Sequence, residues 1–495
     1  MTLARSGAWW RALLTVAALG SWASNARAAG PLGPDGSPIA TSNYRVDLSQ
    51  GVVLGGNRVL GLAGAYVAIA EGIDGNSQNA AAPAVRTAYS FDHLDYDLGF
   101  GLTFPAAVRG NDLFNSGDKT TLSRNQKSAL FIDIGGNLQI GRWGVGLTAS
   151  YMQFQLAPQG QNLGLTSRFG GLRLQIARAF ADGQLVLGVG SRGTGLVVER
   201  ENPSGGSTQL FNIEGADAEF GTLWRPNDQP FRIGAAVRSA VITNDLTTDV
   251  PKDALGDRVL KVGSTNIFLP NAVALPWEIS VGLALQVGRP FNPRWVDPDE
   301  ALARLDRYLR WRELERKRAH ERVLARPNST QAERQAEDAS ASIDAAVDEV
   351  HRERLARAVR EELVRRQRQL ERFYVLVSSS LLVTGPVKDA VGVESFIERR
   401  VQRSGQKATF TPRLGVESEV VPRWLKLRAG SYGEPTRFSS RGARARLHGT
   451  VGFEQKLFPW TVFGLFDDGT EWRLSGALDG ARRYLSWGVS LGVWR

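Results

Sequence analysis

The chain ends with the segment Tyr484 to Arg495, which reads Y-L-S-W-G-V-S-L-G-V-W-R. Side chains of a β-strand alternate between its two faces. One face of this segment is entirely apolar and consists of Leu485, Trp487, Val489, Leu491 and Val493. The same alternation recurs along most of the chain, and no second layer is evident that would cover so many apolar faces. A closed barrel with lipid outside and water inside explains this repetition better than a buried protein core.

Composition and charge narrow the class of protein. The 495 residues include 54 glycines and no cysteine, and 42% of them are apolar. Without cysteine the chain has no disulfide, no thiol nucleophile and no cysteine-based metal site. No segment after the N-terminal leader reaches the roughly 18 uninterrupted apolar residues of a membrane helix. The net charge of +10 favours anionic partners such as lipid, lipopolysaccharide or acidic ligands. No recognition module accompanies it, so we expect no nucleic-acid binding.

The N-terminus has the pattern of a secretion signal. Arg5 and Arg11 are followed by a short apolar run up to Trp22. Ala26-Arg27-Ala28 then fits the rule for signal cleavage between small residues. A retained membrane anchor is the alternative, but the run is too short to span a bilayer. We therefore expect residues 1–28 to be a signal peptide. Export, strand alternation and the absence of cysteine together predict the bacterial outer membrane.

From residue 88 onward, segments of about ten residues alternate in polarity. Trp143 to Tyr151 have an apolar face with an aromatic residue at each end, which matches the two aromatic girdles of a membrane barrel. Val273 to Val287 give the clearest alternation and predict one long lipid-facing strand. Further strands are expected near 168–180, 184–199, 211–226, 231–243, 373–386, 409–422, 424–436, 445–458, 461–474 and 484–495.

The predicted fold is an all-β transmembrane barrel of about 14 antiparallel strands, with an N-terminal hatch in its lumen and an inserted α-helical hairpin. We expect strands 1–8 within residues 88–296 and strands 9–14 within residues 373–495. Short turns such as Gly141-Arg142 alternate with longer connections such as 244–272. Because short turns of such barrels lie on the periplasmic side, both chain termini are expected there.

Charged residues alternate with the apolar ones along these strands. A charge on the lipid face would cost about 2–4 kcal/mol near the midplane, so we place these side chains in the lumen. The lumen charges are Asp133, Arg173, Asp217, Glu219, Arg232, Arg238, Glu278, Arg413, Glu417 and Glu419. Their mixed signs favour ion pairs over a filter of one sign. They either brace and hydrate the barrel or line a selective pathway.

Residues 29–87 lack the strand pattern. Arg58 to Glu71, R-V-L-G-L-A-G-A-Y-V-A-I-A-E, are small and apolar and favour a short helix. Residues 76–86 are polar, rich in alanine and interrupted by Pro83. We expect residues 29–87 to fold inside the lumen as a hatch. A disordered leader is the alternative.

Residues 297–372 break the strand pattern with helical signals. Asp297-Pro298 is a typical helix start, and Thr330 to Glu333 resemble a capping box. Apolar residues repeat at helical spacing in both halves. We therefore predict a helical hairpin, which the strand count places on the periplasmic side. It either docks a periplasmic protein or peptidoglycan, or its two helices pack only on each other.

Several segments together resemble the outer-membrane long-chain fatty-acid transporter family (FadL-type). Gly61 to Glu71 are similar to that family's hatch, which typically reads G-x-A-G-A-x-V-A-x-A-D. N-A-A-A-P-A at 79–84 lies where the family has Asn-Pro-Ala, so that Pro83 and Ala84 match and Asn79 is a displaced equivalent of the asparagine. Gly221 to Val237 are similar to a strand–turn–strand of the family. The chain departs from the family by ending in Trp494-Arg495 instead of the usual aromatic residue.

The resemblance covers the chain except the hairpin. It implies a fourteen-stranded barrel plugged by an N-terminal hatch. It also implies uptake of hydrophobic molecules by diffusion through the lumen and a lateral opening. Ligand-contacting positions of the family do not transfer, because they lie in variable loops and strands.

Two segments match enzyme motifs by spacing alone. Gly488 to Gly492 match G-x-S-x-G, but a nucleophile elbow needs a turn from strand to helix, and this segment lies within the last strand. Gly188 to Gly193 match G-x-G-x-x-G, where no helix and no ribose-binding acid follow. Inward glycines that make space in the lumen explain this segment better. The four histidines are scattered, so we expect no metal site, no cofactor and no enzymatic activity.

The sequence therefore predicts a passive outer-membrane channel for hydrophobic small molecules such as fatty acids. We expect a ligand pocket beside the hatch, near its plug residues Leu60, Leu62, Tyr66, Val67 and Ile69. Expected partners are outer-membrane lipid and lipopolysaccharide, the hydrophobic ligand, and a periplasmic protein or peptidoglycan at residues 297–372. The alternative function is a non-transporting barrel that serves as the scaffold of an envelope assembly through its helical hairpin.

Overall fold

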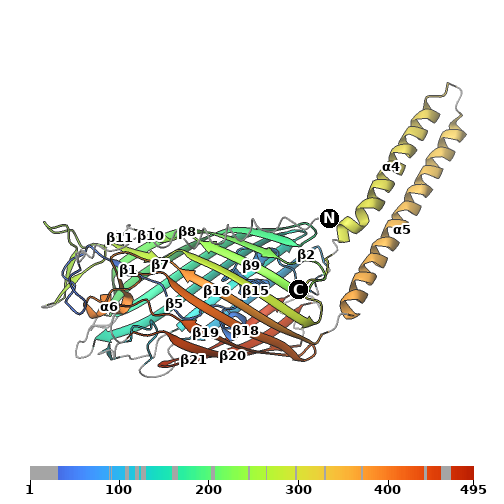
Figure 1. Ribbon diagram of the computed structural model, residues 1–495. Coiled ribbons are helices and arrows are strands. Elements are labelled where there is room, and N and C mark those ends of the chain that lie inside the picture. Colours follow the sequence, from blue (N-terminus) through green and yellow to red (C-terminus); the bar gives the residue numbers. More distant parts are fainter. Residues whose placement is uncertain are drawn as a thin grey trace, which may run out of the picture.

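The computed structural model describes residues 32–494 except 89, 91, 106–110, 118–121, 124–129, 159–164, 202–206, 244–245, 263–264, 296–297, 328–329, 370–371, 440–442 and 459–469. The predicted signal peptide, residues 1–28, lies outside this part of the chain. The main feature is an antiparallel β-barrel from which a helical hairpin extends at one end (Figure 1). The barrel is closed, because β2 pairs with β22 and β8 pairs with β9, and it has 14 strands, as predicted.

The barrel strands fall on both sides of the hairpin in sequence. Those before it are β2 (Leu94–Phe104), β4 (Leu130–Ile140), β5 (Trp143–Pro158), β6 (Leu165–Phe180), β7 (Leu185–Glu201), β8 (Ser207–Trp224), β9 (Phe231–Arg238) and β15 (Glu278–Gly288). Those after it are β16 (Tyr374–Thr384), β18 (Thr409–Val421), β19 (Leu425–Glu434), β20 (Arg446–Lys456), β21 (Glu471–Ala481) and β22 (Tyr484–Trp494). The strand expected near 461–474 is therefore described only from Glu471, and it continues to Ala481.

The outer surface of the barrel is apolar and the inner surface is polar. In β5, Trp143 and Leu147 are each 50% exposed. In β22, Leu485, Trp487 and Val489 are exposed, whereas Ser486 between them is fully buried. A protein surrounded by water rarely exposes a continuous apolar band of this kind. The alternation thus places the apolar face of each strand outward, as expected for a barrel surrounded by lipid.

The two ends of the barrel differ. The short turns, such as the one between Ile140 and Trp143, lie at the end from which the helices extend, here called the hairpin end. The longer connections lie at the opposite, loop end. The C-terminal strand finishes at the hairpin end, as predicted. The first described residues instead lie at the loop end, because β1 (Arg45–Asp47) pairs there with strands of the longer connections.

These pairings form a four-stranded sheet inside the loop end, with the order β10 (Val241–Thr243), β14 (Ala272–Leu275), β1 and β17 (Ala390–Gly392). The sheet corrects two predictions. The strand expected over 231–243 leaves the barrel after Arg238. The strand expected over 273–287 is divided, because Pro276 has no N–H for a ladder and β15 begins only at Glu278. Val273 consequently faces the protein interior, at 2% exposure, instead of lipid.

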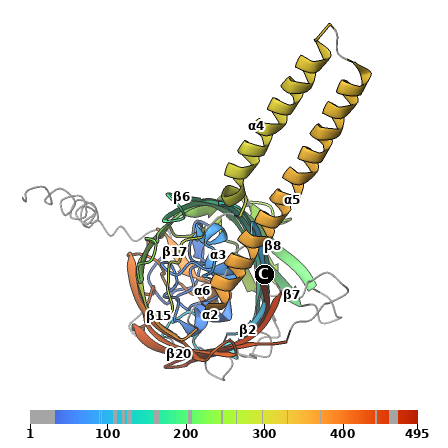
Figure 2. The ribbon, with the colours of Figure 1, turned by 90° about the vertical axis from the view of Figure 1, so that its right-hand side faces the viewer.

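The smaller elements complete the chain. At the loop end these are β3 (Leu122–Ser123), β11 (Leu246–Thr247), β12 (Val259–Val262), β13 (Thr265–Phe268) and α6 (Val393–Glu398). The hatch contains α2 (Asn57–Gly61), α3 (Gly72–Asn76) and the 3-10 helix Ala82–Ala84. An end-on view shows α2 and α3 inside the ring of strands (Figure 2). The hairpin consists of α4 (Pro298–Leu324) and α5 (Gln331–Gln369).

Candidate functional site

The hatch is a compact coil of short turns. The helix expected over 58–71 ends already at Gly61, because Ala63 and Gly64 have left-handed backbones with φ of 55° and 73°. The chain then folds back on itself and buries its apolar side chains. Leu60, Leu62, Tyr66, Val67 and Ile69 are all at most 1% exposed. The predicted plug residues are therefore packed within the hatch and between the hatch and the barrel strands.

The Asn79 motif joins the hatch to the wall. The Asn79 amide donates to the carbonyl oxygen of Val67 in the hatch (2.8 Å) and to that of Thr222 in β8 (3.1 Å). Its side-chain oxygen accepts a hydrogen bond from the Ala81 N–H (3.0 Å). Pro83 and Ala84 form the 3-10 helix that follows. The displaced asparagine thus satisfies backbone groups that the irregular hatch would otherwise leave unpaired.

Inward glycines allow the hatch backbone to approach the barrel wall closely. A Cβ atom at Gly188 in β7 would lie 2.0 Å from the Ala80 oxygen, and one at Gly144 in β5 would lie 2.1 Å from the Pro83 oxygen. Further strands have such contacts with the hatch backbone at Gly221, Gly234, Gly415 and Gly430, and with hatch side chains at Gly282 and Gly488. The G-x-G-x-x-G segment that begins at Gly188 therefore makes room for the hatch, and it continues as a strand without a following helix.

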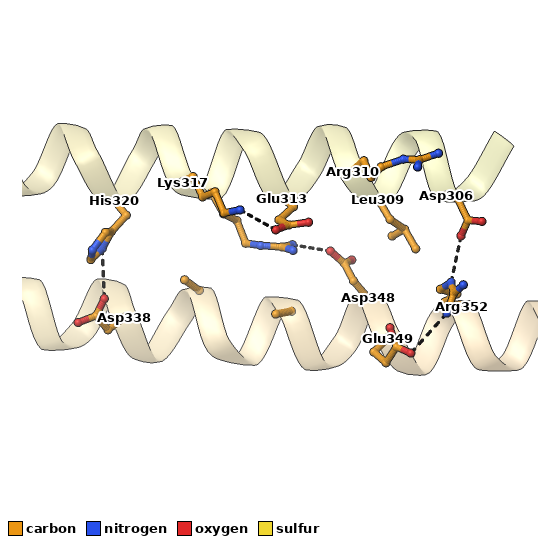
Figure 3. A pocket seen from close by; sticks show the side chains of 13 residues that line it. Asp306, Leu309, Arg310, Glu313, Lys317, His320, Asp338, Asp348, Glu349 and Arg352 are labelled. Carbon is orange, nitrogen blue, oxygen red and sulfur yellow. Dashed lines mark hydrogen bonds and ion pairs between the residues drawn. The ribbon is translucent and has the colours of Figure 1, made fainter. Parts of the chain in front are cut away.

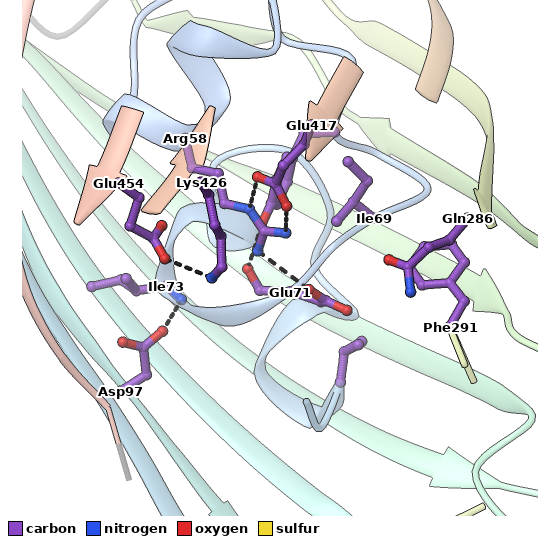
Figure 4. A network of polar contacts seen from close by, with 12 residues as sticks. Arg58, Ile69, Glu71, Ile73, Asp97, Gln286, Phe291, Glu417, Lys426 and Glu454 are labelled. Carbon is purple, nitrogen blue, oxygen red and sulfur yellow. Dashed lines mark hydrogen bonds and ion pairs between the residues drawn. The ribbon is translucent and has the colours of Figure 1, made fainter. Parts of the chain in front are cut away.

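A buried network of opposite charges holds the hatch against strands β18 to β20 (Figure 4). Arg58 donates to both carboxylate oxygens of Glu417, at 2.9 and 2.7 Å, and to Glu71 at 3.2 Å. Arg428 donates to Glu417 and to Glu454, and Lys426 lies 2.7 Å from Glu454. Each of these charges has an opposite partner within the protein, which is the condition for placing ions in a dry interior.

Glu71 is a second carboxylate on which the ion pairs of this network converge. Its carboxylate accepts from Arg232 in β9 at 2.8 Å as well as from Arg58. Burial alone raises the pKa of Glu71, but the guanidinium groups of Arg232, Arg58 and Arg289 lower it to about 2. The carboxylate is therefore ionised at neutral pH, and it joins β9 to the network that Arg58 forms with β18.

The predicted lumen charges all belong to the barrel interior, and most of them are paired there. Arg238 lies 2.9 Å from Glu278 and 3.3 Å from Glu219, and Arg173 also lies 3.3 Å from Glu219. Asp217 pairs with Arg192, and Glu419 accepts from the Arg423 N–H (2.5 Å). Arg413 differs, because among the described residues it donates only to the Gly64 oxygen (3.2 Å) and to Gln78 (3.3 Å).

A cavity of about 280 Å³ lies between the hatch and the wall, on the side of the loop end. One part of its lining is apolar and includes Leu48, Val52, Leu54, Phe131, Met152, Phe169, Leu275 and Leu382. The other part is charged and includes Asp74, Asp133, Arg173, Arg192, Arg238, Glu278 and Arg413. Burial raises the pKa of Asp74. The cavity is therefore amphipathic, with an apolar half and a half in which guanidinium groups predominate.

The sequence analysis predicted only some of the residues that line this cavity. Of the expected lumen charges, Asp133, Arg173, Arg238, Glu278 and Arg413 line it. None of the five predicted plug residues does, and ligand binding by them stays a prediction. The hatch contributes residues 48–56 and 73–78 instead. Sequence reasoning missed these residues and also Arg58 and Glu71. The latter two were detectable as the only charges in the apolar segment 58–71.

The structure offers no support for the other chemistry that the motifs suggested. Ser490 of the G-x-S-x-G segment lies within β22 and not at a turn into a helix. His448 is held between Asp479 (2.8 Å) and Glu434 (2.7 Å) in the wall. Within the described ranges, no group of three or more metal-ligating side chains is close enough to hold an ion. The helices of this part of the chain also include none with the length and hydropathy of a membrane span.

The hairpin is held together by polar contacts (Figure 3). Asp348 of α5 accepts from Arg312 (2.5 Å) and from Arg316 of α4. Further pairs join His320 to Asp338 (3.1 Å) and Arg352 to Asp306 (3.0 Å). The apolar residues Ile343, Val347 and Val350 of the predicted stripe are 46–63% exposed. The two helices therefore do not bury this stripe against each other.

Comparison of the sequence with known protein families and with curated proteins finds no match. Among solved structures, the chain is similar to the CymD monoaromatic hydrocarbon channel, with a TM-score of 0.44 and 9% identity over 90% of this chain and 97% of that one. It is also similar to the toluene transporter TodX of Pseudomonas putida, with a TM-score of 0.42 and 12% identity over 92% and 99% of the two chains. The fold assignment itself rests on the closed ring of strand pairs.

Proposed function

We propose that the protein is a passive channel of the bacterial outer membrane for hydrophobic small molecules, and that it acts after removal of residues 1–28 and without catalysis. The observation that supports this most is the amphipathic cavity beside the hatch. Its volume of about 280 Å³ is close to the lower end of the range of ligand pockets, ~300–1,000 Å³. The lipid-facing band of the barrel provides the membrane context.

The two halves of the cavity suit an apolar molecule with an acidic head, such as a fatty acid. Leu54, Met152 and Phe169 would contact the apolar body. Arg413 lines the cavity and makes no ion pair with any described carboxylate, so its guanidinium is the group best placed to bind a ligand carboxylate. A ligand would leave towards the hairpin end when contacts between hatch and wall rearrange.

Replacing Arg413 with glutamine tests the fatty-acid part of the proposal. Loss of a charge-assisted hydrogen bond is expected to weaken oleate binding to the purified protein about tenfold. Toluene, an uncharged probe, should bind R413Q and the unaltered protein equally. R423Q is the matched control, because Arg423 lies in the turn between β18 and β19 at the hairpin end. Equal oleate binding by all three proteins would exclude Arg413 as the site of the carboxylate.

A second function, a scaffold that acts through its hairpin, is favoured by the exposed apolar residues of α4 and α5. Deleting 297–372 separates the two functions. If the protein is a channel, the shortened protein in lipid vesicles is expected to take up hydrophobic solutes at the rate of the full chain. If the protein is a scaffold, the shortened protein should no longer capture a periplasmic protein or peptidoglycan. Loss of uptake with unchanged capture would contradict both expectations.

A further inference from the structure

The hairpin has one face that the barrel and the other helix leave uncovered. In α4, the side chains of Asp306, Leu309, Glu313 and His320 point towards α5 (Figure 3). Successive residues of an α-helix are rotated by about 100°, so Trp311 lies on the opposite side of α4. In the part of α4 from Arg307 onward, the residues within about 60° of Trp311 are Arg307, Tyr308, Leu314, Glu315, Arg318 and Arg322. We call these seven residues, Trp311 included, the outward face of α4.

The outward face combines large apolar side chains with arginines. Tyr308, Trp311 and Leu314 are 52%, 56% and 54% exposed, and the rings of Tyr308 and Trp311 stack at 6.0 Å. The face has three arginines and one glutamate, and Glu315 is paired with Arg318 at 2.9 Å. Aromatic and aliphatic side chains among arginines are typical of helices that lie in the interface between water and lipid head groups. There the rings enter the boundary while the arginines reach the phosphates.

The position of α4 brings this face close to such an interface. Exposed aromatic residues mark the hairpin end of the barrel, as in the girdles of membrane barrels, and they include Trp143, Trp224, Phe373, Trp424 and Phe458. β15 ends at Gly288 within this rim, and α4 begins at Pro298. At the base of α5, Arg360 lies 4.0 Å from Asp92 beside the start of β2.

The direction in which the hairpin extends also supports a position of α4 near the membrane surface. Figure 1 shows α4 on the side of the hairpin that faces the barrel, with α5 on the far side. The end-on view shows the hairpin extending beyond the outline of the barrel (Figure 2). The region that it overhangs is the membrane surface around the barrel. The outward face of α4, which points away from α5, is therefore turned towards that surface.

We propose that the outward face of α4 docks on the surface of the surrounding membrane at the hairpin end and binds anionic phospholipid head groups. The excess of arginine complements the negative potential of such a surface. A second copy of the chain is a poorer occupant, because a symmetric contact would bring two basic faces together. Docking requires the hairpin to lean further towards the membrane about its connections to β15 and β16. It is independent of transport, since no residue of this face lines the cavity.

Single-cysteine labelling of the full-length protein tests the proposal, because the chain has no cysteine of its own. An environment-sensitive fluorophore is attached at L314C on the outward face or at I343C. Ile343 is the matched control, because it is an aliphatic residue that is 63% exposed on the side of α5 away from α4. Each protein is reconstituted in phosphatidylcholine vesicles with or without about one quarter phosphatidylglycerol, together with a lipid-bound quencher.

Docking predicts at least about threefold stronger quenching at position 314 than at position 343 in the anionic vesicles. Combining R307E with R318E should reduce the quenching at position 314 by about half in anionic vesicles and leave uptake of hydrophobic solutes unchanged. Equal, weak quenching at both positions would overturn the proposal. So would quenching that is unaffected by phosphatidylglycerol, or cross-linking between α4 helices of two copies in place of lipid contact.

Discussion

The hatch and the hairpin both interrupt the strand pattern, and they differ in how deeply their ion pairs are buried. In the hatch, Arg58 and Glu71 are buried and are held by bidentate or multiple ion pairs with the wall. In the hairpin, most pairs, such as Arg352 with Asp306, are partly exposed to water, and the carboxylate of Asp348 is the buried exception among those described. The hatch is fixed on all sides by the barrel, whereas the hairpin touches it mainly at its base. The few charges of the hatch therefore fix it in place, whereas the many charges of the hairpin mainly keep its helices soluble.

Removal of one carboxylate from each region gives the largest expected difference. E71Q removes the carboxylate that compensates the buried charge of Arg232 and leaves Arg58 paired with Glu417 alone, and it is expected to destabilise the docked hatch by about 3 kcal/mol. Hydrogen exchange of the amides of residues 57–71 in the detergent-solubilised protein measures this directly. The matched change D306N breaks an exposed pair and should leave the exchange of the hairpin unaltered. Equal effects of the two substitutions would remove the distinction between the regions.

The glycine contacts give a second, smaller test of how tightly the hatch is held. G188A places a Cβ atom against the Ala80 backbone, and overpacking of this kind costs about 1–3 kcal/mol. We expect the hatch to loosen and the ion conductance of the protein in planar bilayers to rise. G193A is the control in the same strand, since its Cβ atom would meet nothing closer than 3.8 Å. Unchanged conductance of G188A would mean that the hatch backbone adjusts without opening.

Acid should loosen the hatch, with the smallest effect of the three. The pKa of Glu71 falls from 4.5 to about 2 in the folded protein, where arginines stabilise the carboxylate against the cost of burial. Its contribution to hatch docking is therefore complete above about pH 4.5 and is lost as the pH falls towards 2. Conductance should stay constant from neutral pH to about pH 5 and rise below it. The E71Q protein lacks this carboxylate, so its conductance should lose that part of the acid response.

Particular segments show where sequence reasoning succeeds and where it fails. The period-two pattern of β5 and β22 was sufficient to predict which face meets lipid, because a strand alternates whatever its neighbours are. The same rule was wrong at Val273, where the pattern is intact but the partner is β1 and not a barrel strand. For the candidate site, the charges Arg173 and Arg413 were found because they lie on predicted strands. Leu48 and Leu54 were missed, because the irregular hatch has no period from which to assign a face.

The sequence by itself determined the alternation of the strands and the helical hairpin, since these follow from local periodicity and from capping residues. Only the tertiary structure decided which charges meet in the lumen, where the cavity lies and which side of α4 faces the membrane. These features depend on distances between segments that are hundreds of residues apart, as between Arg58 and Glu417. Such distances are set by closure of the barrel around the hatch, and no local pattern in the chain encodes them.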